Sequence, residues 1–279
     1  YAIMSDNRIF GICTDFAGPL KSARCPVCGS AGPFKEMDRV NGYLLLRCNS
    51  CFLEFSESMH YNPAYYERMH YSENPSLESV EVLSKEEFLS AASLLASNDS
   101  WQPHNHILRW MESNLRKGSC VLDIGCGVGW FIAALESKGF KAIGIEVSTR
   151  IVEMLKNKGL SVYLGPFEKL EIDFSAPDLV VLLGVIEHVS DPVGLLKNIR
   201  SKFPKSTLLI SIPSPKRWDF GIGIRNYWDY PPNHLTPVWT QSSLGIALKK
   251  SGYRLKEWFF PDVPADDIWH ILLDSVFFR

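Results

Sequence analysis

From Gly118 onward, short apolar runs alternate with stretches of helical spacing, and this alternation is the strongest constraint on the fold. The apolar runs CVLDI, KAIGIEV, SVYLG, DLVVLLG and TLLISI are interleaved with the helical stretches WFIAALESKG, TRIVEMLKNKG and PVGLLKNIRSKF. Strands joined through helices run parallel, because a parallel pair needs a crossover connection. The pattern predicts an α/β domain with a Rossmann-like, doubly wound, mainly parallel sheet and helices on both faces.

Glycine, proline and helix-capping residues lie where these helices are expected to begin and end. Gly139 and Gly159 follow two of the helical stretches, where a left-handed residue is favoured, and Pro192 suits a first helical turn. Ser84 with Glu87 forms a capping box ahead of further helices. One more helix and strand are expected up to Phe260, where the sheet should end.

The chain of 279 residues has room for such a domain and a smaller module. The final residues, PDVPADDIWHILLDSVFFR, are apolar on one helical face, which is compatible with a homodimer contact, a membrane-surface helix or truncation. The predicted organisation is an unassigned leader (1–24), a small cysteine-rich module (25–75), linking helices (76–117), the α/β domain (118–260) and a carboxy-terminal amphipathic segment (261–279).

Bulk charge and hydropathy exclude some function classes. The net charge of −2 and the pI near 6.4 provide no global attraction to nucleic acid or anionic lipid. No apolar run approaches the roughly 20 residues that span a bilayer, and the amino terminus lacks the order of a secretory signal. A cytoplasmic protein without a transmembrane segment is therefore expected.

Four of the seven cysteines form two close pairs, which predicts a metal site. Cys25 and Cys28 lie in CPVCG, and Cys48 and Cys51 lie in CNSC. This C-x2-C-x19-C-x2-C spacing falls in the zinc-ribbon range, because two such turns complete a tetrahedral set of four sulfur ligands. We predict structural Zn²⁺ in an amino-terminal zinc ribbon; iron and two disulfides are the alternatives.

The stretch VLDIGCGVGWF places three glycines in the first strand-to-helix turn, where ligands bind to open parallel sheets. A dinucleotide motif, G-x-G-x-x-G, would have a small residue at position 130, which is Trp130, and the lysine of a phosphate-binding P-loop is absent. The motif is instead D-x-G-x-G-x-G. Glu146 ends the next strand about 20 residues later, the distance at which such a fold delivers an acid to ribose hydroxyls.

This motif resembles motif I of the class I S-adenosylmethionine-dependent methyltransferases. The segments YLGPFEKL and PDLVVLLGVIEHVSDPVGLLKNI look like the third- and fourth-strand regions of the ubiquinone-biosynthesis type. The resemblance implies that the glycine turn faces the methionine part of the donor, that Asp123 holds its amino group, that the loop after the third strand surrounds adenine, and that the end of the fourth strand lines the sulfonium. The implied donor site consists of Asp123, Gly125, Cys126, Gly127, Gly129, Glu146, Val147, Phe167, Glu168, Gly184 and Val185.

Two histidines are candidates for the base that an oxygen or nitrogen acceptor requires. His188 follows the fourth strand of the α/β domain, and His234 lies in the aromatic segment YWDYPPNHLTP. Each also has a structural alternative, packing beneath the cofactor for His188 and a buried hydrogen-bond network for His234. The aromatic residues around His234, which are Tyr227, Trp228, Tyr230 and Trp239, suit an apolar or ring-bearing acceptor, or else belong to the core.

We therefore predict methyl transfer from S-adenosylmethionine to a small-molecule or glycan-precursor acceptor, at oxygen in preference to nitrogen or carbon. The order of zinc ribbon, NPAYYE segment and α/β domain is similar to that of bacterial methyltransferases that include sugar C-methyltransferases. The alternatives are an RNA methyltransferase that uses the zinc ribbon for substrate binding and a non-catalytic S-adenosylmethionine-binding protein. Between positions 20 and 80 acids balance bases, which opposes binding to a nucleic-acid backbone.

Overall fold

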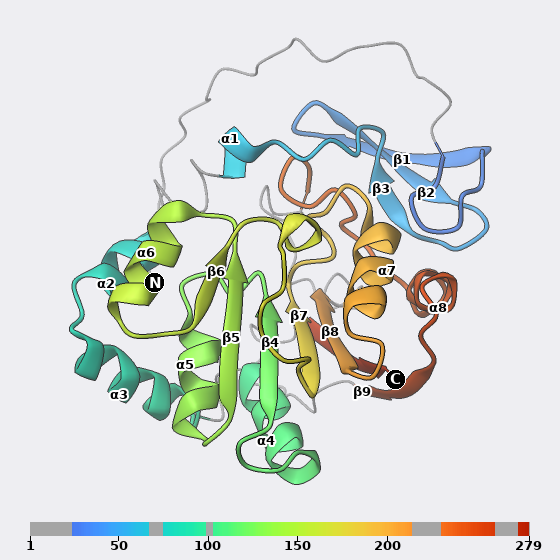
Figure 1. The fold of residues 1–279 in the computed structure, drawn as a ribbon. Helices are drawn as coiled ribbons and strands as arrows, with labels where there is room; N and C mark the ends of the chain where they lie inside the picture. The colour runs from blue at the N-terminus through green and yellow to red at the C-terminus, as the bar shows by residue number, and fades with distance from the viewer. Residues whose placement is uncertain (1–23, 67–74, 99–102, 214–229, 260–272, 279) are drawn as a thin grey trace.

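The computed structural model describes residues 24–66, 75–98, 103–213, 230–259 and 273–278 (Figure 1). Almost all of the predicted leader and residues 260–272 lie outside these ranges, as do Tyr227 and Trp228. The described residues form a three-stranded sheet, a seven-stranded sheet and the helices that cover the larger sheet. None of these helices is long and apolar enough to cross a lipid bilayer.

The large sheet has the predicted parallel core. Its strand order is β6-β5-β4-β7-β8-β10-β9, and the strands from β6 to β8 pair in parallel. Their bounds are β4 (Cys120–Ile124), β5 (Lys141–Glu146), β6 (Val162–Leu164), β7 (Leu179–Leu183) and β8 (Thr207–Pro213). The sequence order reverses between β4 and β7, which makes the carboxyl ends of these two strands the place where a doubly wound fold binds ligands.

Alternate residues of the central strands face two different apolar cores. In β4, Val121 belongs to one cluster with helix α5, whereas Leu122 and Ile124 belong to the other with helix α7. Because side chains alternate along a strand, a sheet buried on both faces needs such continuous apolar runs. The covering helices are α5 (Trp130–Ser137), α6 (Thr149–Asn157), α7 (Pro192–Lys202) and α8 (Gln241–Lys250).

The predicted helix boundaries are confirmed. Gly139 and Gly159 have φ values of 85° and 78°, in the left-handed region that glycine adopts without a steric penalty. Pro192 occupies the first turn of α7, and the side chain of Asp191 caps that helix by accepting a hydrogen bond from the Gly194 N–H at 2.8 Å.

The prediction for the end of the chain is wrong for residues 273–278. These residues form strand β10 (Leu273–Phe278), which pairs antiparallel with β8 on one side and with β9 (Leu255–Phe259) on the other. The sheet therefore continues beyond Phe260. A short apolar run such as LLDSVFF fits a helix face or a buried strand equally well, and here the open edges of β8 and β9 decide the outcome.

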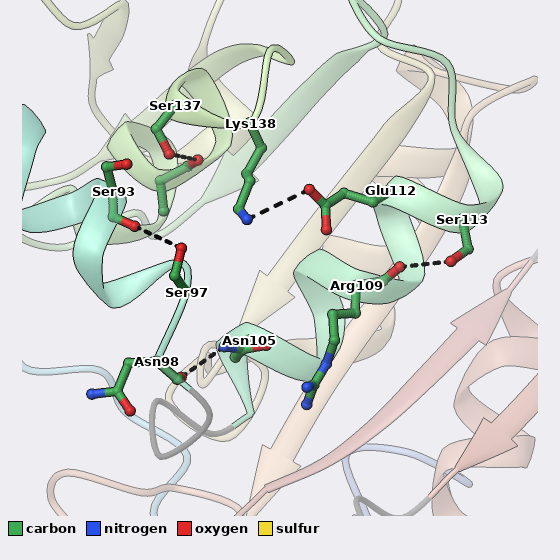
Figure 2. A network of polar contacts seen from close by, with 10 residues as sticks. Ser93, Ser97, Asn98, Asn105, Arg109, Glu112, Ser113, Ser137 and Lys138 are labelled. Atoms are coloured by element: carbon green, nitrogen blue, oxygen red, sulfur yellow. Dashed lines mark hydrogen bonds and ion pairs between the residues drawn. The ribbon is translucent and has the colours of Figure 1, made fainter.

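The linking helices are present as α2 (Pro75–Glu81), α3 (Lys85–Leu95) and α4 (His104–Asn114). Ser84 and Glu87 form the predicted capping box at the start of α3. Figure 2 shows how polar contacts tie these helices together: the side chain of Asn105 donates to the Asn98 carbonyl at 2.7 Å, and Lys138 pairs with Glu112 on α4. This layer covers the face of the sheet opposite α7 and α8.

The cysteine-rich module is a small antiparallel sheet of β1 (Phe34–Val40), β2 (Tyr43–Cys48) and β3 (Glu54–Ser56). A short helix, α1 (Pro63–Tyr66), follows it. In Figure 1 this module, in blue, lies beside the half of the molecule that carries α7 and α8, away from α2 and α3. Its apolar residues join the same core cluster as those helices, so the module and the large domain share one core.

Candidate functional site

A cavity of about 750 Å³ opens across the carboxyl ends of the parallel strands, within the usual size range of small-molecule sites. It extends from the loop after β6 to the loop after β7, with the glycine turn after β4 and the end of β5 between them. Its lining includes these residues of the predicted donor site: Gly125, Gly127, Glu146, Val147, Phe167, Glu168, Gly184 and Val185.

At two of its three glycines, the glycine turn leaves no room for a β-carbon. Gly125, Gly127 and Gly129 all have positive φ, at 78°, 51° and 83°. A β-carbon at position 125 would lie 2.7 Å from Cγ2 of Val185, and one at position 129 would lie 2.5 Å from Cδ2 of Leu155. Gly125 and Gly127 line the cavity, whereas Gly129 begins helix α5 beneath it and permits close packing with α6.

The carboxylate of Glu146 is held rigidly at the edge of the cavity. Its Oε2 accepts a hydrogen bond from the Gly127 N–H at 3.0 Å, and its Oε1 accepts from Val147 and Ser148 at 2.6 and 3.1 Å. The residue is only 4% exposed, yet it lines the cavity. Three backbone donors fix its orientation, as a site that recognises hydroxyl groups requires.

Asp123 and Cys126 lie below the cavity and are not among its lining residues. Asp123 is 2% exposed and its Oδ1 has no hydrogen-bond partner among the described residues. Burial, and then the nearby Glu146 carboxylate, raise the pKa of Asp123 to about 7. Burial also raises the pKa of the Cys126 thiol, whose sulfur packs against Gly144, so this cysteine is an unreactive small apolar residue.

At the other end of the cavity, the structure brings the two predicted histidines together. Their ring centroids are 4.5 Å apart, with the ring planes at 87°. The Nδ1 atom of His188 lies 2.9 Å from the carbonyl oxygen of Asn233, and His188 lines the cavity while His234 is buried behind it. A carbonyl can only accept, so Nδ1 carries the proton, and neutral His188 has its lone pair on Nε2.

The four predicted metal ligands also converge. The sulfur atoms of Cys25, Cys28, Cys48 and Cys51 all lie within 4.8 Å of one another, with Cys25 to Cys51 at 3.5 Å and Cys28 to Cys48 at 3.4 Å. A tetrahedral zinc site with Zn–S bonds of about 2.3 Å separates its sulfurs by about 3.8 Å. The hydrogen bond between Cys25 and Cys51 lowers the pKa of the Cys25 thiol and raises the pKa of the Cys51 thiol, because the two sulfurs share one proton. The cluster therefore fits a metal ion.

Comparison with known families decides the identity of the α/β domain. Residues 102–257 match a family described as a methyltransferase domain, and this region is more than half of the chain. The chain belongs to this methyltransferase family. The methyltransferase domain includes the linking helix α4, the glycine turn and both histidines.

Similarity to individual proteins is more distant. A ubiquinone biosynthesis O-methyltransferase of Coxiella burnetii (strain RSA 493 / Nine Mile phase I) is 28% identical over 137 aligned positions, in an alignment that covers 43% of this chain and 58% of that protein. The enzyme of the same name from Rickettsia typhi is 33% identical over 116 aligned positions, in an alignment that covers 38% of this chain and 47% of that protein. The chain thus spans somewhat more than half the length of the Coxiella protein.

Solved structures confirm the fold of the methyltransferase domain. A chain from the complex of the Haloferax volcanii Trm112 methyltransferase activator with a methyltransferase matches with a TM-score of 0.50 and 20% identity, covering 68% of this chain and 96% of that one. An S-adenosylmethionine-dependent methyltransferase from Clostridium acetobutylicum also matches with a TM-score of 0.50, at 14% identity, covering 66% and 93%. At these identities the matches show the Rossmann-like fold alone.

Tyr230 and Trp239, for which the sequence left both an acceptor-side and a core position open, are core residues of the methyltransferase domain. Tyr230 and Trp239 are 2% and 1% exposed and are not among the residues that line the cavity. Trp239 belongs to the apolar cluster that the small sheet and α8 share, and its segment is bridged to the small sheet at Val238.

Sequence reasoning missed the tyrosines that line this end of the cavity. Tyr61 and Tyr66, from the NPAYYE region, have ring centroids 4.9 Å apart, and Tyr66 packs edge-on against His188 at 5.4 Å. The Tyr61 N–H donates to the hydroxyl of Ser190 at 3.1 Å, which fastens this segment over the loop after β7. The available signal was the cluster of tyrosines around NPAYYE, but only the fold brings Tyr61 and Tyr66, and not Tyr65, to the lining of the cavity.

Proposed function

We propose that this chain transfers the methyl group of S-adenosylmethionine to an oxygen atom of a small-molecule or glycan-precursor acceptor. The observation that carries the proposal is the single cavity that runs from the fixed carboxylate of Glu146 to His188. A donor bound against Glu146 presents its methyl group towards His188. The name of the matched Coxiella and Rickettsia enzymes, O-methyltransferase, supports oxygen as the accepting atom.

The donor end would hold each part of S-adenosylmethionine with a different feature. Glu146 is placed to accept hydrogen bonds from the ribose hydroxyls, and the bare backbone of Gly125 and Gly127 allows close approach of the methionine part. Buried Asp123 is the candidate partner of the donor's ammonium group. Phe167 and Glu168 would contact adenine, and Gly184 with Val185 would line the sulfonium.

The sulfonium supplies a reactive methyl group, so the protein's share is to align the acceptor and remove its proton. We assign the proton removal to Nε2 of His188, because Nδ1 donates to Asn233. His234, which is buried behind His188, packs against it and stabilises the charged His188 ring that results. The rings of Tyr61 and Tyr66 form an apolar wall that suits a ring-bearing acceptor.

We further propose that Cys25, Cys28, Cys48 and Cys51 bind one structural Zn²⁺. The convergence of the four sulfur atoms supports this assignment. Metal analysis of the purified protein should find about one zinc per chain, and Cys48→Ser should lose it and lower the melting temperature. Iron in the wild-type protein, or two disulfides by mass spectrometry, would rule out zinc.

The charges of the zinc ribbon argue against an RNA methyltransferase. Arg39 and Arg47 pair with Glu57 and Glu54, at 3.9 and 3.1 Å. Two lysines on the neighbouring helices α8 and α7 are also engaged: Lys250 donates to two backbone carbonyls of the ribbon, and Lys202 donates to those of Phe167 and Leu170. Cations held in this way are poorly placed to follow a phosphate backbone.

The decisive test combines donor binding with turnover. Isothermal titration should show binding of S-adenosylmethionine and not of NAD, and S-adenosylhomocysteine should accumulate with an acceptor from a panel of phenols, catechols and nucleotide sugars. Binding of NAD in place of S-adenosylmethionine would refute the donor assignment. Donor binding without turnover on any acceptor would support the non-catalytic alternative instead.

A further inference from the structure

The edge strand of the zinc ribbon is hydrogen-bonded to the segment that carries His234. The Glu54 N–H donates to the Val238 carbonyl at 3.0 Å, and the Ser56 N–H donates to the Leu235 carbonyl at 2.8 Å. Glu54 and Val238 form an isolated antiparallel bridge. Residues 235–238 therefore continue the small sheet by one short, irregular strand.

A second contact reaches the beginning of the same segment. Asn41, in the turn between β1 and β2, donates from Nδ2 to the Pro231 carbonyl at 2.7 Å. The ribbon thus holds this segment at 231, 235 and 238, on both sides of His234.

The cysteine turns of the ribbon are themselves fixed to helix α8. The hydroxyl of Thr240, at the start of α8, donates to the Cys51 carbonyl at 3.0 Å. Lys250, at the end of α8, donates to the carbonyls of Val27 and Cys28 at 2.9 and 2.8 Å. Both cysteine turns therefore lie against the helix that follows the His234 segment, and their shape is set by the metal they are built to hold.

Residues 231–238 in turn fix His188, the histidine that lines the cavity. The Asn233 carbonyl accepts from Nδ1 of His188, and the ring of His234 packs against that of His188. The Thr236 N–H donates to the Glu187 carbonyl at 3.0 Å. Glu146 at the donor end is instead held by the N–H groups of Gly127, Val147 and Ser148, which belong to the methyltransferase domain. The two ends of the cavity are thus supported by different parts of the chain.

We propose that the zinc ribbon is a positioning element for the acceptor half of the site, with Asn41 as a positioning residue. The ribbon holds residues 231–238 so that the Asn233 carbonyl keeps the proton of His188 on Nδ1 and the lone pair on Nε2. Loss of this support impairs methyl transfer and leaves donor binding intact. The inference rests on the proposed role of His188 as the base.

The first test compares Asn41→Asp with Asn114→Asp. Asp tolerates the left-handed backbone of position 41, where φ is 55°, but its oxygens cannot donate to Pro231. Asn114 is the matched control, because its Nδ2 donates to the Trp110 carbonyl at 2.9 Å on the exposed side of α4. We expect Asn41→Asp to lower kcat about tenfold or more, to broaden or shift the His188 Nδ1–H signal in nitrogen-15 NMR, and to change donor affinity less than twofold.

A second pair of variants loosens the ribbon from α8. Lys250→Met removes the two hydrogen bonds to the Val27 and Cys28 carbonyls, while Lys249→Met, in the same helical turn, is the control. Lys250→Met should reproduce the effects of Asn41→Asp in a milder form, with zinc content measured for each variant. Removing zinc with a chelator from the wild-type protein should weaken the His188 signal before it affects donor binding.

The NMR signal decides the proposal independently of turnover. A His188 Nδ1–H signal in Asn41→Asp identical to that of Asn114→Asp would overturn the positioning role. A loss of donor affinity equal to the loss of kcat would also overturn it, because the ribbon would then support the whole domain. If the wild-type protein binds donor and shows no turnover, the proposed function fails, whereas a His188 signal that still responds to Asn41→Asp upholds the positioning role.

Discussion

The rings of His188 and His234 meet edge to face, 4.5 Å between centroids, although one follows strand β7 and the other lies in the segment beneath the zinc ribbon. Asn233 joins them, because its carbonyl fixes Nδ1 of His188 while the next residue supplies the second ring. The pair therefore brings together two parts of the chain that are distant in sequence. Both the methyltransferase domain and the ribbon therefore determine the geometry of this pair.

Replacing His188 distinguishes the role of its Nδ1 atom from that of its Nε2 atom. His188→Asn retains a donor near the position of Nδ1 but has no base near Nε2, so kcat should fall by about 10²- to 10⁴-fold while donor affinity stays within threefold. The formation of S-adenosylhomocysteine and calorimetric titration of the donor give the two quantities. His106→Asn, on helix α4, is the control and should retain wild-type kcat. Full activity of His188→Asn would exclude this histidine as the base.

Replacing Glu146 tests the donor end. Glu146→Gln puts an amide donor against the backbone N–H groups that now bind both carboxylate oxygens, and it removes the charge that we propose accepts from ribose. We expect donor affinity to fall by about 10- to 100-fold, in line with about 1.5 to 3 kcal/mol for a hydrogen bond to a charged group. Glu153→Gln, exposed on α6, should bind donor as the wild type does. Equal affinities for the two variants would contradict the ribose assignment.

Donor binding should depend on pH through Asp123. The pKa of about 7 means that this carboxyl binds a proton in the free protein below neutral pH, whereas a bound ammonium group favours the ionised form. Donor affinity should therefore fall as pH drops below about 7, by at most tenfold per pH unit, and level off above it. Calorimetry of wild type and Asp123→Asn between pH 5 and 8 provides the test. A slope that persists in the variant would assign the proton to another group.

The Asp123 carboxyl should also make the free energy of unfolding depend on pH in the absence of donor. Its folded-state pKa lies above its ordinary value of 3.8, so between about pH 4 and 7 the folded protein binds a proton that the unfolded chain has lost. The contribution of Asp123 to stability is therefore highest below about pH 4, falls as pH rises to 7 and is constant above. Denaturant unfolding of Asp123→Asn, subtracted from that of the wild type, should show this fall, and a rise with pH would refute it.

Gly125 should not tolerate a side chain, for two reasons whose costs in stability can be measured separately. Gly125→Ala has both a positive φ and a collision with Val185, whereas Gly118→Ala has a similar φ of 82° and no atom within 4 Å of the new methyl group. We expect a loss of about 1–2 kcal/mol for Gly118→Ala and of about 2–5 kcal/mol for Gly125→Ala, measured by denaturant unfolding. Adding Val185→Ala should restore part of the stability of Gly125→Ala only. Equal losses in both single variants would show that the collision relaxes at no cost.

The features that could be predicted depend on residues that are close together in the sequence. The spacing of Cys25, Cys28, Cys48 and Cys51, the glycines after Asp123 and the acid at the end of the next strand each need only one short connection to reach their place. Strand-helix alternation then sets the parallel core, because crossovers leave few topologies open.

The rest depends on contacts between distant segments. Tyr61 and Tyr66 carry no periodic signal that points to the cavity, and they reach it because the ribbon docks beside α7. Asn233 acts through its backbone carbonyl, which every residue possesses, so its identity could not reveal its role. Tyr230 and Trp239 have the composition of a binding surface and the burial of a core, and composition does not separate the two.

The insertion of β10 between β8 and β9 has a consequence for the order of assembly. Strand β9 precedes β10 in the chain but pairs with β10 rather than with β8, so it has no partner in the large sheet until residues 273–278 have been synthesised. During translation β8 remains an open edge over the same interval, next to β7, the strand that leads to His188. A shortened polypeptide that ends after β9 should therefore expose two unpaired strand edges at once and associate with itself, even though every residue of the cavity described here is present.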